Sequence, residues 1–271
     1  MTPSVHTTEK KYRDLLGELR SMKKALVAFS GGVDSTFLLH AARQALDENV
    51  LAVSIATPYI PVPEIEDARS VAQAMNVRHL VVEVPFPEPL RANPPDRCYL
   101  CKLSLFTLLQ DVAAREKIAH VLDGTNLDDL DDYRPGLRAL GELGVKSPLL
   151  TSGLTKQDIR DLSKAHGLAT WDKPAAACLL SRIPHGTRIE ETELRRIDQA
   201  ERFLKDLGFA AVRLRSHGDL ARIEVPREWV GEVIEADRRH GIDARLKELG
   251  YRHVTVDLAG YRLGSLNVNA A

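Results

Sequence analysis

Residues 30–35, with the sequence Ser-Gly-Gly-Val-Asp-Ser, constrain the fold of this chain more than any other stretch. They follow the apolar run 25–29, which is typical of a buried strand, and lead into residues 36–40, which are typical of a helix. The adjacent Gly31 and Gly32 allow the backbone to approach an anion closely. The start of the helix adds free N–H groups and the positive end of its dipole. The stretch therefore predicts a phosphate-binding turn between a strand and a helix.

The phosphate-binding motif is neither of the two commonest kinds. A Walker A loop would end in Gly-Lys-Ser/Thr, and no lysine is present, while GxGxxG does not fit either. The stretch resembles the PP-loop of the ATP pyrophosphatases, S-G-G-x-D-S, which grips the pyrophosphate of ATP during transfer of AMP. A glycine turn that only ends a core strand is the alternative, and six matching positions directly after a strand argue against it. The residues that we assign to ATP are Ser30, Gly31, Gly32, Val33, Asp34, Ser35 and Gly124, of which Asp34 and Ser35 are also assigned to catalysis.

Composition narrows the class of protein. The chain has 271 residues, of which 44% are hydrophobic, enough for one large or two modest globular domains. Lys plus Arg total 37 against 38 for Asp plus Glu, so we expect no nucleic-acid partner. No apolar run reaches the length of a membrane span, and residues 1–10 lack the apolar core of a signal peptide. We therefore expect a cytoplasmic protein that does not contact a membrane.

Strands and helices alternate through the first two thirds of the chain. This order predicts an α/β fold with a doubly wound parallel sheet, which binds ligands outside the carboxyl ends of its strands. We place a domain boundary near Gly186, so that residues 1–186 form the PP-loop domain. The strands of its sheet are expected at residues 25–29, 50–56, 77–84 and 120–123.

Residues 187–271 are expected to form a smaller α+β domain that binds the substrate. Its centre is an antiparallel hairpin of residues 212–215 and 221–225, in which apolar and charged residues alternate. The alternation places Arg213 and Arg215 on one face of the hairpin. Two neighbouring arginines can hold a phosphate by forked hydrogen bonds, and a solvated strand face explains the same pattern.

Three cysteines, an odd number, favour metal binding or thiol chemistry over a set of disulfides. The proline-rich loop 85–97 delivers Cys98 and Cys101 to the start of a helix. Cys178 lies in a stretch of small residues and prolines, with Arg182 four residues later. A nearby cation lowers the pKa of a thiol and favours the reactive thiolate, although an inert buried cysteine is equally compatible with the sequence.

An acidic run follows the last strand of the predicted sheet. Asp128, Asp129, Asp131 and Asp132 provide four carboxylates in five residues. Such a run can recruit a divalent cation beside a triphosphate, and a solvated acidic loop explains it as well.

The whole chain is similar to the LarE family of ATP-dependent sulfur transferases, which build the nickel-pincer nucleotide cofactor of lactate racemase. The resemblance implies that ATP adenylates a carboxylate of pyridinium-3,5-biscarboxylic acid mononucleotide with release of pyrophosphate. A sulfur nucleophile then displaces AMP, and two rounds give the bis-thiocarboxylic product. Besides the PP-loop, the segments that carry the resemblance are residues 153–156, 171–174, 177–182, 213–224 and 260–265.

The same resemblance implies the ligands and partners. ATP would act with Mg²⁺, a small-molecule nucleotide would be the substrate, and an unidentified donor would supply sulfur. The protein would form a homo-oligomer. The residues assigned to the nucleotide substrate are Arg182, Arg213, Arg215 and Glu224.

The cysteines leave two versions of the sulfur step open. In better-known family members, the cysteine matching Cys178 gives up its own sulfur. Cys98 and Cys101 are additional cysteines, as in a subgroup that resembles cluster-dependent tRNA-thiolating enzymes. There, three cysteines hold a [4Fe-4S] cluster and leave one iron free for an extra sulfide. We expect the cluster on Cys98, Cys101 and Cys178. One alternative is a tetrahedral zinc site, which would need a fourth ligand such as a histidine, and another is a redox disulfide between Cys98 and Cys101.

Three other functions compete with sulfur transfer to a nucleotide. A tRNA-thiolating enzyme should carry an RNA-binding domain and a basic stripe, which the balanced charge does not support. A glutamine-amide or NAD synthetase should work with a glutaminase domain, for which the sequence has no candidate, although a separate partner stays open. A nucleotide-binding sensor would hold ATP without releasing pyrophosphate.

Overall fold

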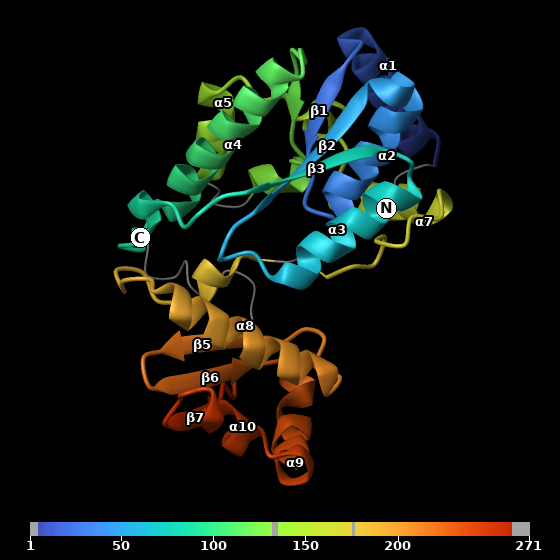
Figure 1. Cartoon of the computed structure of the whole chain (residues 1–271). Coiled ribbons are helices and arrows are strands. Elements are labelled where there is room, and N and C mark those ends of the chain that lie inside the picture. The colour runs from blue at the N-terminus through green and yellow to red at the C-terminus, as the bar shows by residue number, and fades with distance from the viewer. Residues whose placement is uncertain (1–4, 132–134, 175–176, 262–271) are drawn as a thin grey trace. The chain divides into compact units, whose positions relative to one another are not determined.

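The computed structural model of this chain describes residues 5–131, 135–174 and 177–261. Asp132 of the acidic run and residues 262–265 of the family-like tail lie outside the described residues. The chain divides into two compact units (Figure 1). The first unit consists of Met1–Thr57, Val62–Pro87 and Asp96–Ala176. The second consists of Ala177–Ala271 together with two short earlier pieces, Pro58–Pro61 and Glu88–Pro95.

The predicted boundary at Gly186 stays a prediction, and the contacts start the second unit earlier. Leu179 donates a backbone hydrogen bond to the Tyr59 carbonyl, and Gly186 donates one to the Asn93 carbonyl, both at 2.9 Å. The Asn93 side chain also donates to the Ile183 carbonyl at 3.1 Å. These bonds attach the segment before Gly186 to the two short pieces that the second unit takes from earlier in the sequence.

The first unit contains a four-stranded parallel sheet in the order β3-β2-β1-β4, which confirms the predicted fold class. Its strands are β1 (Ala25–Ala28), β2 (Val50–Ala56), β3 (Arg78–Glu83) and β4 (Val121–Leu122). The fourth strand is shorter than predicted, with two residues. The helices of this unit are α1 (Val5–Met22), α2 (Val33–Leu46), α3 (Val62–Ala74), α4 (Arg97–Arg115), α5 (Gly136–Glu142), α6 (Pro148–Thr151) and α7 (Lys156–Ala165), with 3-10 turns η1 (Asp47–Asn49) and η3 (Leu127–Leu130).

Helices cover both faces of this sheet (Figure 1), and an apolar core lies on each face. Successive side chains of a strand point to opposite faces. Val27 of β1 accordingly packs with α1 and α2, while the adjacent Leu26 packs with Phe106 and Leu109 of α4. The central strands are therefore apolar at nearly every position, as expected for a parallel sheet covered on both faces.

The second unit contains a three-stranded sheet in the order β5-β6-β7. The predicted hairpin is confirmed, because β5 and β6 pair antiparallel, while β7 lies parallel to β6. The turn is tighter than predicted, with Gly218 at φ +68° joining the strands. The strands are β5 (Arg213–His217), β6 (Leu220–Glu224) and β7 (His253–Val256), and the helices are α8 (Glu191–Asp206), α9 (Val230–His240) and α10 (Ile242–Glu248), with 3-10 turns η2 (Glu88–Leu90), η4 (Leu179–Arg182) and η5 (Arg227–Trp229).

In the part of the chain that the structure describes, no helix has both the length and the apolar composition needed to cross a membrane.

Asp158, near the start of α7, ties this helix to α1. It is buried, caps α7 with Thr155, and accepts hydrogen bonds from Thr8 at 2.8 Å and Lys11 at 2.6 Å. Burial alone would raise the pKa of Asp158, but the hydrogen bonds from Lys11, Thr155 and Thr8 outweigh it and lower the pKa to about 2. The carboxylate therefore stabilises the first unit.

We predict that Asp158→Asn lowers the free energy of unfolding at pH 7 by about 2 kcal/mol, because each unit of pKa shift is worth about 1.4 kcal/mol. A depressed pKa contributes stability above the unfolded value of 3.8 that is lost as the pH falls toward about 2. Denaturant unfolding between pH 7 and pH 2 should show the difference between wild type and variant shrinking below pH 4. Asp161→Asn, on the exposed side of the same helix, should change little, and an equal loss in both variants would contradict the assignment.

Candidate functional site

The PP-loop lies between β1 and α2, and two glycines allow its close packing. Gly31 has φ +69°, and a Cβ added there would lie 3.0 Å from the Cα of Ala68 in α3. Gly124 follows β4 and lies against the first turn of α2, where an added Cβ would be 3.2 Å from the backbone nitrogen of Ser35. The loop and the start of α2 are therefore enclosed by backbone from two other elements, and the predicted Gly124 does meet the loop.

The two serines of the motif hold the loop closed on itself. The hydroxyls of Ser30 and Ser35 lie 3.0 Å apart. The Ser35 hydroxyl also donates to the Gly32 carbonyl at 3.3 Å and accepts from the Ser30 backbone N–H at 3.3 Å. Gly32 forms the N-cap of α2, so the first turn of that helix points its N–H groups out of the loop. This arrangement suits an anionic ligand.

Two lysines border the loop, and reasoning from the sequence did not assign either to the site. Lys156 donates to the Asp34 carboxylate, which also accepts from Asn126 at 3.3 Å. Lys173 donates to the Gly31 carbonyl at 3.3 Å and to Asp67 at 2.8 Å. Both lysines lie in segments that carry the family resemblance, which was the available signal. Two ammonium groups at a phosphate loop suit the charge of a triphosphate.

Two residues of the acidic run, Asp128 and Asp129, act in local structure. Asp129 is buried and forms a capping box with Asn126 at the start of η3. Asp128 accepts a hydrogen bond from the Lys156 backbone N–H at 2.9 Å. Within the described residues, no group of three or more His, Cys, Asp or Glu side chains is arranged to hold a metal ion. A cation bound by this run therefore stays a prediction.

The three cysteines are divided between the two units. Cys98 is exposed and Cys101 half-buried in the first turn of α4, three residues apart and so on one side of the helix. Cys178 belongs to the second unit and directly precedes η4. It is half-buried and not enclosed in the core. The shared cluster stays a prediction.

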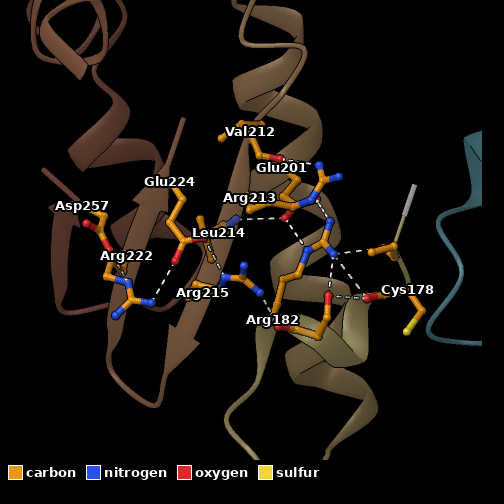
Figure 2. A network of polar contacts seen from close by, with 12 residues as sticks. Cys178, Arg182, Glu201, Val212, Arg213, Leu214, Arg215, Arg222, Glu224 and Asp257 are labelled. Atoms are coloured by element: carbon orange, nitrogen blue, oxygen red, sulfur yellow. Dashed lines mark hydrogen bonds and ion pairs between the residues drawn. The ribbon is translucent and has the colours of Figure 1, made fainter. Parts of the chain in front are cut away.

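Arg182 connects the Cys178 segment to α8 through a buried ion pair (Figure 2). Its guanidinium donates to both oxygens of Glu201, at 2.8 and 2.9 Å, and both side chains are only 3% exposed. Nη1 donates in addition to the carbonyls of Ala177 at 3.0 Å and Cys178 at 3.3 Å. Burial alone would lower the pKa of Arg182, but the Glu201 carboxylate raises it overall, so the pair stays charged.

Arg213 and Arg215 are buried, at 8% and 5% exposure, so the alternative of a solvated strand face is wrong. Alternation along β5 identifies a shared face but does not report whether that face is covered. Arg215 donates to Glu224 at 2.9 Å and to the Ser181 carbonyl at 2.5 Å (Figure 2). Glu224 also accepts from Arg222 at 2.8 Å.

Arg213 lies near Arg182, Arg215 and the Glu201 carboxylate. It donates to the Val212 carbonyl at 2.9 Å and lies over the Tyr261 ring, 5.2 Å from its centroid. Burial and the positive charge of Arg182 together lower the pKa of Arg213. The predicted substrate residues Arg182, Arg213, Arg215 and Glu224 thus come together in one polar network of the second unit (Figure 2).

A parallel α/β sheet with S-G-G-x-D-S between its first strand and the next helix defines the PP-loop ATP pyrophosphatase class. The comparisons agree with this class. A model of the NAD synthase family matches residues 5–91, the part of the chain that contains the loop.

Three relatives match nearly the whole chain. Pyridinium-3,5-bisthiocarboxylic acid mononucleotide synthase of Lactiplantibacillus plantarum is 36% identical over 96% of this chain and 95% of its own length. Uncharacterised proteins of Synechocystis and Methanocaldococcus jannaschii are 40% and 32% identical, over 94% and 93% of this chain and 95% and 96% of their own lengths. The chain belongs to the family of pyridinium-3,5-bisthiocarboxylic acid mononucleotide synthase, which confirms the resemblance to LarE.

We predict that Gly31→Ala weakens ATP binding by about tenfold or more, equivalent to about 1.4 kcal/mol, because the new Cβ would press on the backbone of Ala68. Gly144→Ala is the matched control, because Gly144 has a similar φ of +63° but nothing within 4 Å of an added Cβ. Calorimetric titration with ATP should separate the two variants. Equal affinity in both would mean that the close contact with α3 does not shape the ATP site.

Proposed function

We propose that this protein is an ATP-dependent sulfur transferase that converts the carboxylates of pyridinium-3,5-biscarboxylic acid mononucleotide into thiocarboxylates. The observation that carries the proposal is the PP-loop, with its enclosed glycines and with Gly32 at the N-cap of α2, where a helix start suits an anion. The substrate is proposed from the name of the Lactiplantibacillus plantarum relative, which contains the bisthiocarboxylic product.

In the first step, a carboxylate oxygen of the substrate attacks the α-phosphorus of ATP, and the bond to the bridging oxygen of the β-phosphate breaks. Pyrophosphate leaves with the electron pair of that bond. The N–H groups of α2, Lys156 and Lys173 would stabilise the charge that develops on pyrophosphate, and Mg²⁺ would neutralise the phosphates further. Asp34, held by Lys156 and Asn126, would keep this lysine at the loop.

In the second step, a sulfur nucleophile attacks the carbon of the acyl-adenylate, and AMP leaves. A carboxylate resists such attack until its oxygen becomes part of a good leaving group, so adenylation has to come first. Two rounds would convert both carboxylates.

The anionic nucleotide would bind to the arginine network of the second unit. Arg213 is the best placed to respond to it, because its positive charge is disfavoured by burial and by Arg182 and would be relieved by an anion. Arg215 and Glu224 hold each other at 2.9 Å and would orient the face that binds. Arg182 is engaged by Glu201 and by two carbonyls, so we propose that it fixes the segment around Cys178.

The donor set of the three cysteines fits an iron–sulfur cluster in its chemistry, because thiolates are the ligands that such clusters need. We propose that Cys98, Cys101 and Cys178 hold a [4Fe-4S] cluster. When bound, it would supply a place for an exchangeable sulfide. The second candidate is that Cys178 gives up its own sulfur, which its position next to Arg182 and outside the core also favours. We further propose a cytoplasmic homo-oligomer supplied by an unidentified sulfur donor.

The first test is the identity of the products. Wild type should release AMP and pyrophosphate in equal amounts, only with Mg²⁺ and the mononucleotide, because the PP-loop holds pyrophosphate as the leaving group. Asp34→Ala and Ser35→Ala should abolish this release, while Asp161→Ala on the exposed side of α7 should not. Quantification of nucleotides and pyrophosphate gives the answer, and ADP as the product would overturn the proposal.

The second test separates the two sources of sulfur by the mass of the intact protein before and after anaerobic turnover. An unchanged polypeptide with repeated turnover is expected for the cluster. Cys98→Ser and Cys101→Ser should then lose bound iron and activity together. Loss of one sulfur and two hydrogen atoms from Cys178, with single turnover that survives Cys98→Ser, would establish the sacrificial version instead.

A further inference from the structure

A single peptide group, between Phe29 and Ser30, joins β1 to the PP-loop, and side chains hold both of its ends. β1 ends at Ala28. The Phe29 carbonyl accepts a hydrogen bond from the Ser54 hydroxyl of β2 at 2.6 Å. The Ser30 N–H donates to the Ser35 hydroxyl of α2 at 3.3 Å. Because a peptide group is planar, fixing its oxygen and its N–H fixes the direction in which the chain enters the loop.

The Ser54 hydroxyl is held in turn by His79 of β3, whose Nε2 lies 2.8 Å from it. A carbonyl can only accept, so the one hydroxyl proton of Ser54 is used at Phe29. The contact with His79 then requires that Nε2 carries a proton and donates it to Ser54. The imidazole also packs edge-on against the Phe29 ring, with centroids 5.7 Å apart and an interplanar angle of 86°.

Burial excludes water from the Ser54–Phe29 end of this chain of hydrogen bonds, whereas His79 is half-buried. Ser54 is 1% exposed and Phe29 is 3% exposed. Without the donor on His79, the Ser54 hydroxyl could turn away from the Phe29 carbonyl, and a buried carbonyl without a donor is costly. The orientation of the loop's first peptide group therefore depends on a residue two strands away from β1 in the sheet order.

We propose that His79 is a positioning residue for the PP-loop, acting through the Ser54 hydroxyl on the Phe29–Ser30 peptide group. The inference rests on the proposed function insofar as it assigns ATP to this loop. His79 touches no reacting atom in this scheme. Its contribution is the proton on Nε2, which sets the rotamer of Ser54.

The first experiment reads the protonation of His79 in the wild-type protein, so that it does not depend on any variant folding. Nitrogen-15 NMR of labelled histidine should show a neutral ring with the proton on Nε2 at neutral pH. A proton on Nδ1 alone would overturn the proposal, because Ser54 would then have no donor.

The second experiment uses three variants and measures ATP affinity by calorimetry. His79→Leu and Ser54→Ala should each weaken ATP binding about fivefold or more, the usual scale for one net hydrogen bond. The double variant should bind ATP no more weakly than the weaker of the two single variants, because both substitutions break the same chain of hydrogen bonds. His79→Gln, whose side-chain amide can donate in place of Nε2, should bind ATP within about twofold of wild type.

Two outcomes keep this inference separate from the proposed function. If wild type forms AMP and pyrophosphate but His79→Leu binds ATP as tightly as wild type, only the role of His79 is lost. If wild type forms no pyrophosphate, the proposed function fails regardless of His79. His253→Leu, a change at an exposed strand histidine of the second unit, is the control and should leave ATP affinity unchanged.

Discussion

Confinement of β1 is the constraint on which the rest of the first unit depends. The strand is paired on both edges, with β2 and β4, and its side chains enter apolar cores on both faces. A strand with no free edge and no free face cannot shift its register without exposing apolar groups. The place where it ends is therefore fixed, and the loop that follows has to begin at the carboxyl edge of the sheet. Gly31 and Gly124 then bring neighbouring backbone up to that position.

A buried polar network fixes the local geometry at the centre of the second unit. Glu201 lies between Arg182 and the β5 backbone, because it also accepts from the Leu214 N–H at 2.9 Å. Burial alone would raise the pKa of Glu201, but Arg182 lowers it overall. Such a pair contributes little net stability compared with apolar side chains, but breaking it leaves a buried charge. In this unit it determines where the backbone on either side of Cys178 lies, which explains why a polar network occupies the centre of a small domain.

Sequence reasoning predicted the sheet, the loop and the hairpin because each depends on local pattern. Strand periodicity, adjacent glycines and alternation at Arg213 and Arg215 are visible within a few residues. The contacts of the loop with Lys156 and Lys173 cannot be seen in a short stretch of sequence, because these lysines lie 122 and 142 residues along the chain from their partners at the loop. The burial of the hairpin arginines also escaped prediction, because a two-residue period identifies a face and does not reveal what packs on it. His79 carried no motif at all, and only its distance to Ser54 reveals it.

The second unit also draws two short pieces, Pro58–Pro61 and Glu88–Pro95, from between elements of the first. The ribosome therefore synthesises parts of the second unit before the first unit is complete. Those parts can form their contacts with Leu179 and Gly186 only after the residues beyond Ala177 have been synthesised. No single cut in the polypeptide separates the two units into intact pieces. Limited proteolysis or gene truncation near Gly186 would consequently remove most of the second unit while leaving the Tyr59 and Asn93 segments behind. The two units are therefore interleaved in the order of synthesis.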